Sequence, residues 1–199
     1  MPTARPGVPA SRAGVVVPLR SFRQGKGRLA PVLDDDARVA LAREMAGAVL
    51  DAARGRPTVV VSGDPEVRAF CAARGADCVD DPGSLDASAE AGRRWVRARG
   101  LSRVVVVHAD LPLASSLDVL DPGDGHLAVV VPDHRDDGTP ALSVPAAAPF
   151  RFSYGPGSFA RHVAEARRCG LGVAVVRDRA LGFDVDLPED LDRLRARAR

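Results

Sequence analysis

Lysine is almost missing from this chain: Lys26 is the single lysine among 28 basic residues, and the others are arginine. A strong excess of charge is missing too, because 26 acidic residues leave a net charge of only +2 and the two signs are interleaved. No long basic face is present, so binding of nucleic acid is not predicted. Small anionic ligands are compatible with this composition.

Cysteine is scarce, and Cys71, Cys78 and Cys169 show no C-x-x-C spacing. An odd number without that spacing supports neither a disulfide framework nor a zinc site, so we expect buried, reduced thiols in a cytoplasmic protein. No apolar run is long enough to span a membrane. Residues 1–13 lack the apolar core of a signal peptide and are interpreted as a disordered N-terminal tail before a single domain, residues 14–199.

The signatures of several enzyme classes are also absent. The chain has no G-x-S-x-G elbow, no G-x-x-x-x-G-K-[ST] loop and no G-x-G-x-x-G loop. Its four histidines form no H-x-x-x-H motif, and His108 is interpreted as a structural residue at a strand end. A serine hydrolase, a P-loop NTPase and a dinucleotide-binding protein are therefore not indicated.

The sequence does contain a regular alternation of short apolar runs and helical segments. With 199 residues, 46% of them apolar, the chain can bury one substantial core. The alternation predicts a three-layer α/β fold, in which a mostly parallel sheet is covered by helices on both faces. The expected strands are 15–19, 58–62, 78–80, 104–107, 127–131, 141–144 and 172–176, and the expected helices are 35–53, 65–73, 84–99, 158–168 and 188–196.

The loop after the first strand, PLRSFRQGKGRLAP, has the composition of a phosphate site. Ligands of such sheets bind outside the carboxyl ends of the strands. The loop carries Arg20, Lys26 and Arg28 and no acid, and Gly25 and Gly27 flank the lysine. Glycines let backbone N–H groups approach phosphate oxygens, and the cations neutralise their charge. The loop is therefore a candidate triphosphate site, with a flexible solvated loop as the alternative.

Acidic residues follow two other extended segments. Asp110 comes just after the strand 104–107, where a buried carboxylate is costly unless it is paired. Near the C-terminus, FDVDLPED places Asp184 and Asp186 two residues apart, so alternation puts both carboxylates on one face. Carboxylates beside a phosphate site suit Mg2+. The alternatives are a turn role for Asp110 before Pro112, and helix capping by Asp186.

A third segment, FSYGPGSFARH, is a candidate anion site. Ser158 is expected to cap a helix that begins at Phe159, and Gly155 and Gly157 expose N–H groups before it. A helix N-terminus with this preamble attracts anions, although an ordinary capped turn is an even alternative. The nearby DDGTPAL offers Thr139 as a further hydroxyl.

Five motifs occur in one order between Val15 and Leu194: VPLRSFRQGKGRLAP, HADLPL, DDGTPAL, YGPGSFARH and GFDVDLPEDL. Together they resemble the guanylyltransferases of deazaflavin coenzyme biosynthesis, which activate 2-phospholactate or phosphoenolpyruvate with GTP. The resemblance implies a Rossmann-like nucleotidyltransferase domain of the GT-A type. It also implies Mg2+ as cofactor, GTP and a small phosphorylated carboxylic acid as partners, and a possible hand-off of the product to the next enzyme.

The resemblance further implies roles for individual residues. The implied catalytic residues are Lys26 and Arg28, and the implied metal ligands are Asp110, Asp184 and Asp186. The implied nucleotide-binding residues are Pro18, Leu19, Arg20, Lys26, Arg28, Ser84 and Asp86. The implied acceptor-binding residues are Thr139, Gly155 and Ser158.

Three positions depart from the usual pattern of this family. Arg20 stands in place of a lysine, and Asp86 and Pro140 each stand in place of an asparagine, whose amide can donate a hydrogen bond. Phosphoenolpyruvate is the preferred acceptor, because the arginine-rich composition points to the bacterial branch of the family. The alternatives are 2-phospho-L-lactate or 3-phosphoglycerate as acceptor, a noncatalytic nucleotide-binding homologue, and a sugar-phosphate or molybdopterin nucleotidyltransferase.

Overall fold

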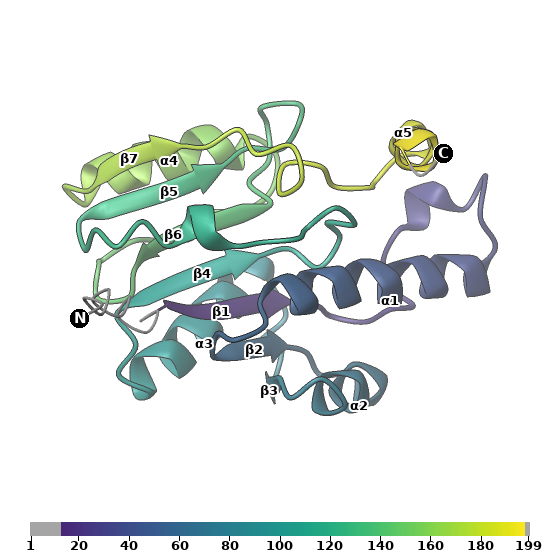
Figure 1. The fold of residues 1–199 in the computed structure, drawn as a ribbon, viewed down its shortest axis with the longest axis horizontal. Helices are drawn as coiled ribbons and strands as arrows, with labels where there is room; N and C mark the ends of the chain where they lie inside the picture. The colour runs from purple at the N-terminus through teal and green to yellow at the C-terminus, as the bar shows by residue number, and fades with distance from the viewer. Residues whose placement is uncertain (1–12, 198–199) are drawn as a thin grey trace, which may run out of the picture.

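The computed structural model describes residues 13–197 and arranges them around a seven-stranded sheet (Figure 1). The strands are β1 (Ala13–Pro18), β2 (Thr58–Val61), β3 (Asp77–Val79), β4 (Arg103–Val107), β5 (Leu127–Val131), β6 (Ala141–Pro145) and β7 (Gly172–Val175). The helices are α1 (Asp35–Ala52), α2 (Pro65–Ala72), α3 (Leu85–Ala98), α4 (Ser158–Arg168) and α5 (Pro188–Arg197), with short 3-10 helices η1 (Gly27–Leu29) and η2 (Asp118–Leu120). Every predicted strand and helix is present.

The strand order is β3-β2-β1-β4-β6-β5-β7. Strands β1 to β4 run parallel to one another, and β7 runs parallel to β5. Strand β6 is antiparallel to both of its neighbours. The mostly parallel sheet is confirmed, but the reversal of β6 was not predicted. It follows from the short loop 132–140, because a parallel crossover needs a dozen or more residues.

Valine side chains of the central strands are buried on both faces, which explains their unbroken apolar runs. Val15 and Val17 belong to the core shared with α1 and α2, whereas Val16 belongs to the core shared with α3 and α4. Gly92 lets α3 lie directly on β1, since a Cβ there would meet Val16 Cγ1 at 2.1 Å. The predicted three-layer architecture is therefore confirmed.

Short polar side chains start the first three helices. Asp34 accepts the N–H of Ala37 at 2.8 Å and is the N-cap of α1. Asp64 precedes Pro65 and accepts the N–H of Glu66 at 2.8 Å, and Ser84 accepts that of Ala87 at 3.2 Å. These caps satisfy N–H groups that have no partner within the helix.

The N-terminal boundary differs slightly from the prediction. Residues 1–12 of the expected tail lie outside the described residues, but Ala13 is fully buried and is the first residue of β1, opposite Arg103. Cys71 is buried as expected, whereas Cys78 and Cys169 are partly exposed, and all three are free thiols. Within residues 13–197, no helix combines the length and the apolar character needed to cross a bilayer.

A small separate core lies beyond the carboxyl ends of the strands, where Figure 1 places η1 and α5. It joins the first loop to the C-terminal segment. Leu29 and Met45 are buried there with Phe183, Val185 and Leu191. Because Val185 points into this core, the acids on either side of it in the sequence face away from it. This packing brings the first loop and the C-terminal acids to the same edge of the sheet.

Candidate active site

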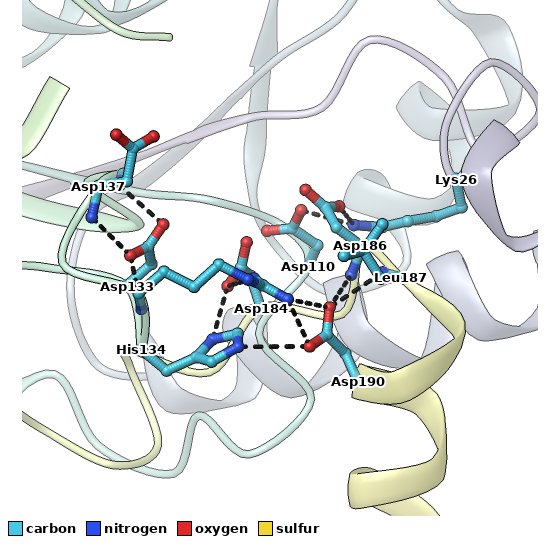
Figure 2. A network of polar contacts seen from close by, with 11 residues as sticks. Lys26, Asp110, Asp133, His134, Asp137, Asp184, Asp186, Leu187 and Asp190 are labelled. Carbon is cyan, nitrogen blue, oxygen red and sulfur yellow. Dashed lines mark hydrogen bonds and ion pairs between the residues drawn. The ribbon is translucent and has the colours of Figure 1, made fainter. Parts of the chain in front are cut away.

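Lys26 lies between two carboxylates from distant parts of the chain (Figure 2). Its Nζ donates to Asp110 Oδ2 at 2.7 Å and to Asp186 Oδ1 at 2.6 Å, and its side chain is only 9% exposed. Burial alone would lower the pKa of Lys26, but the two neighbouring carboxylates outweigh it and raise the pKa above its usual value. The lysine is therefore a fully charged, buried cation.

The backbone at Lys26 is in the left-handed region, with φ at 63°. This conformation costs an L-residue with a Cβ roughly 1–2 kcal/mol. The flanking residues Gly25 and Gly27 have φ outside that region, so their role is not to supply a left-handed turn. The two ion pairs of the Lys26 side chain offset this local strain, which is common at functional sites.

Asp184 is the third acid of this region. Burial raises its pKa to about 6, and the negative charges of Asp110 and Asp186 add to the effect. Its Oδ1 has no hydrogen-bond partner, although it lies 3.5 Å from His134 Nδ1 and 4.0 Å from Arg135 Nη1. Asp110 and Asp186 thus contact Lys26, whereas Asp184 lies beside them and faces His134 and Arg135 (Figure 2).

Two oxygens in this cluster are suited to a divalent cation. Asp110 Oδ1 and Asp184 Oδ1 are both buried without a hydrogen bond, which is costly for a carboxylate. Over the described part of the chain, no group of three or more His, Cys, Asp or Glu side chains is arranged to hold a metal ion. Asp110, Asp184 and Asp186 therefore do not form a ligand set in this arrangement, in which Lys26 engages both Asp110 and Asp186.

A cavity of about 380 Å³ opens beside Lys26. It is bounded by the first loop, α1 and the end of β4, and its wall includes Pro18, Leu19, Arg20, Gln24, Lys26, Met45, Leu85, His108, Asp110 and Asp186. A second cavity of about 330 Å³ shares Pro18, Leu19, Arg20 and Leu85 with the first and extends to Asp81, Ser84 and Ser88. The two cavities adjoin and form one long cleft.

Most of the predicted nucleotide-binding residues line this cleft, but two do not. Arg28 is exposed on η1 and lies outside the walls of both cavities. Asp86 also lies outside them, because its Oδ1 accepts the backbone N–H of Tyr154 at 2.6 Å and so links α3 to the segment before α4. Arg20 lines the cleft while its Nε donates to Asp81 at 3.0 Å.

Ser158 does not cap α4, contrary to the prediction. Gly157 is the N-cap, with φ at 72°, and Ser158 is the first residue of the helix. The left-handed glycine turns the chain into the helix, and its N–H donates to Asp137 Oδ1 at 3.0 Å. The hydroxyl of Ser158 is instead 3.2 Å from Thr139 Oγ1.

The predicted acceptor residues Thr139 and Ser158 are in contact but almost wholly buried. The buried ring of His162 contacts Thr139. Its Nε2 accepts the N–H of Ser153 at 3.0 Å, so the ring proton is on Nδ1, which lies 3.1 Å from Thr139 Oγ1. Burial lowers the pKa of His162 to about 4, so the ring is neutral at pH 7. Gly155 lies on the exposed turn ahead of α4.

Several residues at this edge were not identified from the sequence. His108 lines the first cavity with its Nε2 unpartnered, so the interpretation of His108 as purely structural is incomplete. His134, Arg135 and Asp190 form a second group next to Asp184. Asp190 accepts the backbone N–H of Leu187, as the acid of a capping box does, but Leu187 is not the Ser or Thr that would have marked this pair in the sequence. The ring of Tyr154 contacts His108, and its hydroxyl is buried without a partner.

Solved nucleotidyltransferase structures resemble this fold. A candidate nucleotide-diphospho-sugar transferase of Desulfovibrio desulfuricans G20 superposes with a TM-score of 0.72 at 20% identity, over 92% of this chain and 86% of that one. A nucleotidyl transferase from Methanothermobacter superposes with a TM-score of 0.64 at 18% identity, over 93% and 96% of the two chains. The fold is therefore that of the GT-A-like nucleotidyltransferases.

Sequence relatives are closer. The phosphoenolpyruvate guanylyltransferase of Rubrobacter xylanophilus is 39% identical over 91% of this chain and 92% of its own. That of Sphaerobacter thermophilus is 37% identical over 92% of each. The 2-phospho-L-lactate guanylyltransferase of Halorubrum lacusprofundi is 36% identical over 90% of this chain and 82% of its own. The family model described as "Guanylyl transferase CofC like" matches residues 13–196. The chain therefore belongs to the CofC-like guanylyltransferase family.

Proposed function

We propose that this protein is a phosphoenolpyruvate guanylyltransferase of deazaflavin coenzyme biosynthesis, acting in the cytoplasm. It would transfer GMP from GTP to the phosphate of phosphoenolpyruvate and release pyrophosphate. The observation that carries the proposal is the position of Lys26 between Asp110 and Asp186, at the wall of a cleft made of two adjoining cavities of about 380 and 330 Å³. The names of the Rubrobacter and Sphaerobacter relatives support this choice of acceptor.

The first loop would bind the triphosphate. In an in-line transfer, a phosphate oxygen of the acceptor forms a bond to the α-phosphorus of GTP, and the bond to the leaving pyrophosphate breaks. A phosphate dianion is already a nucleophile, so this chain need not provide a general base. Lys26 would neutralise the charge that develops on the leaving pyrophosphate, and Arg28 would add to it by turning its exposed side chain toward the cleft.

Asp110 and Asp184 would hold Mg2+, because each has a buried oxygen without a hydrogen bond. Mg2+ takes one or two carboxylates and completes its shell with phosphate oxygens and water. Asp186 becomes available to it when Lys26 turns from this carboxylate to the triphosphate. When bound, the ion supplies Lewis-acid neutralisation of phosphate charge.

The acceptor would lie between the acids and the turn ahead of α4. Gly155 provides an exposed backbone there, and the buried contact of Ser158 with Thr139 holds the turn in place. The unpartnered groups of His108 and Tyr154 are further polar atoms on this side. A 2-phospho-L-lactate acceptor is the second candidate, supported by the name of the Halorubrum relative.

The test is to incubate the purified protein with GTP, Mg2+ and one acid at a time: phosphoenolpyruvate, 2-phospho-L-lactate or 3-phosphoglycerate. Pyrophosphate release and the product mass are then measured. We expect the mass of the GMP adduct of phosphoenolpyruvate, in which the two phosphates form one diphosphate link, as the main product. A protein whose melting temperature rises with GTP, but which releases no pyrophosphate with any acid, is a nucleotide-binding homologue and not an enzyme.

A further inference from the structure

Asp190 is a fully buried carboxylate directly behind the C-terminal acids. Its Oδ2 accepts the backbone N–H of Asp186 at 3.2 Å and that of Leu187 at 2.9 Å. These two bonds fix the orientation of the peptide groups on either side of the Asp186 Cα. The direction in which the Asp186 side chain leaves the backbone therefore depends on Asp190.

Asp190 in turn forms a salt bridge with Arg135, which comes from another part of the fold. Arg135 Nη2 donates to Asp190 Oδ1 at 2.7 Å and to Oδ2 at 3.0 Å. His134 lies between two of the acids, with its Nε2 3.3 Å from Asp190 Oδ1 and its Nδ1 3.5 Å from Asp184 Oδ1 (Figure 2). Arg135 and His134 both belong to the loop between β5 and β6.

That loop is itself held rigidly. The two carboxylate oxygens of Asp133 accept the N–H groups of Arg135 at 2.9 Å, Asp137 at 3.0 Å and Gly138 at 2.8 Å. Arg135 therefore projects from a loop with few free backbone groups. A rigid donor fixes its acceptor more accurately than a mobile one does, and outer-shell contacts of this kind orient metal ligands.

We propose that Asp190 and Arg135 are a positioning pair, which holds Asp184 and Asp186 in the orientation needed to bind the divalent cation. This inference rests on the proposed function, since it presumes that these two acids serve the metal. Helix capping alone needs only the contact of Asp190 with the backbone of residues 186 and 187. The complete burial of Asp190 and its salt bridge to a loop 55 residues away exceed that need.

The test measures GTP affinity by calorimetry over a series of Mg2+ concentrations, without an acceptor. Asp190→Asn keeps an oxygen that can accept the two N–H groups but removes the charge. Arg135→Met removes the cation and leaves the capping contacts intact. Because loss of an outer-shell partner usually costs a metal site 10- to 100-fold, we expect both variants to need at least tenfold more Mg2+ for the same gain in GTP affinity. Their GTP affinity without Mg2+ should be unchanged.

Matched controls are Glu189→Gln and Arg193→Met. They remove one charge each from the same turns of α5, where both side chains are exposed. The inference is overturned if Asp190→Asn and Arg135→Met depend on Mg2+ as the wild type does, or if the controls shift equally. If Asp190→Asn does not fold, the Mg2+ dependence of Arg135→Met alone decides the test.

The same titration separates a failure of this inference from a failure of the proposed metal site. A wild-type protein whose GTP affinity is independent of Mg2+ would overturn both. A wild-type protein that responds to Mg2+, together with variants that respond equally, would overturn only the positioning role.

Discussion

Lys26 and Asp186 are 160 positions apart in the sequence, and their Nζ and Oδ1 atoms lie 2.6 Å apart. With Asp110 on its other side, the lysine ammonium neutralises the acids that are proposed to serve a divalent cation. A metal ion on the unpartnered oxygens Asp110 Oδ1 and Asp184 Oδ1 would lie close to this ammonium group, and the two positive charges would repel each other. Lys26 and Mg2+ are therefore expected to compete in the absence of nucleotide.

Lys26→Met tests this competition, since methionine keeps an unbranched side chain and removes the charge. We expect the nucleotide-free variant to bind Mn2+ about tenfold more tightly than the wild type, a change of ~1.4 kcal/mol. Its GTP affinity should fall, because the triphosphate loses a cation. Electron paramagnetic resonance of free Mn2+ measures the first effect. An unchanged or weaker Mn2+ affinity would contradict the competition.

Asp110→Asn is expected to lower the rate of pyrophosphate release by roughly 100- to 1,000-fold, the usual cost of losing one electrostatic contact in the transition state. The thermal midpoint should change little. Two effects on stability oppose each other. The substitution removes one charged partner of Lys26, but it also removes the negative charge of Asp110, which repels the carboxylate of Asp184 and raises its pKa. Asp192→Asn, at an exposed site on α5, is the control. Normal turnover by Asp110→Asn would refute its role as a metal ligand.

His162 should make the protein less stable in acid. Burial lowers its pKa to about 4 in the folded state, from 6.5 when unfolded, so between these values the unfolded chain binds more protons. Stability is therefore lost as the pH falls, by roughly 2 kcal/mol between pH 7 and pH 5. Urea unfolding at several pH values measures this slope, and we expect it to flatten in His162→Asn.

Two features make that comparison specific. Asp184 acts in the opposite direction, because its raised pKa of about 6 favours the folded state as the pH falls. Only the difference between wild type and variant therefore isolates His162. His126→Asn, at an exposed position, should retain the wild-type slope. An equal slope in wild type and His162→Asn would show that this ring does not titrate on unfolding.

Gly92→Ala should destabilise the protein by about 1–3 kcal/mol, the usual cost of overpacking a core. The new Cβ would meet Val16 Cγ1 at 2.1 Å and would push α3 away from β1. Gly47→Ala in α1 is the matched control, since the new Cβ would approach the side chain of Arg74 only to 3.8 Å. That substitution should stabilise by about 0.5–1 kcal/mol through helix propensity. Urea midpoints of the same sign for both variants would contradict this packing argument.

Local signals were enough to predict the secondary structure and the edge at which the site lies. The run of valines in β4 indicates a strand buried on both faces, and Asp34 and Asp64 mark helix starts. The acids around Val185 were expected on one face because side chains alternate in an extended segment. These features depend on residues close together in the sequence, so a single chain reveals them.

Long-range geometry was not predictable in the same way. Asp186 rather than Asp184 pairs with Lys26 across 160 positions of the sequence, and no local pattern distinguishes these two acids. The salt bridge from Arg135 to Asp190 depends on where β6 reverses the chain. Ser158 resembles a cap in sequence, but Gly157 starts the helix, leaving the serine hydroxyl to contact Thr139.

The small core that joins η1 to the C-terminal segment has a consequence for synthesis on the ribosome. All seven strands precede residue 176, so a nascent chain that ends there already contains every strand of the sheet. It still lacks Asp184, Asp186 and the helix that holds them. Since folding proceeds from the N-terminus during translation, such a chain acquires its architecture first and its chemistry only after the segment with these acids and α5 has emerged.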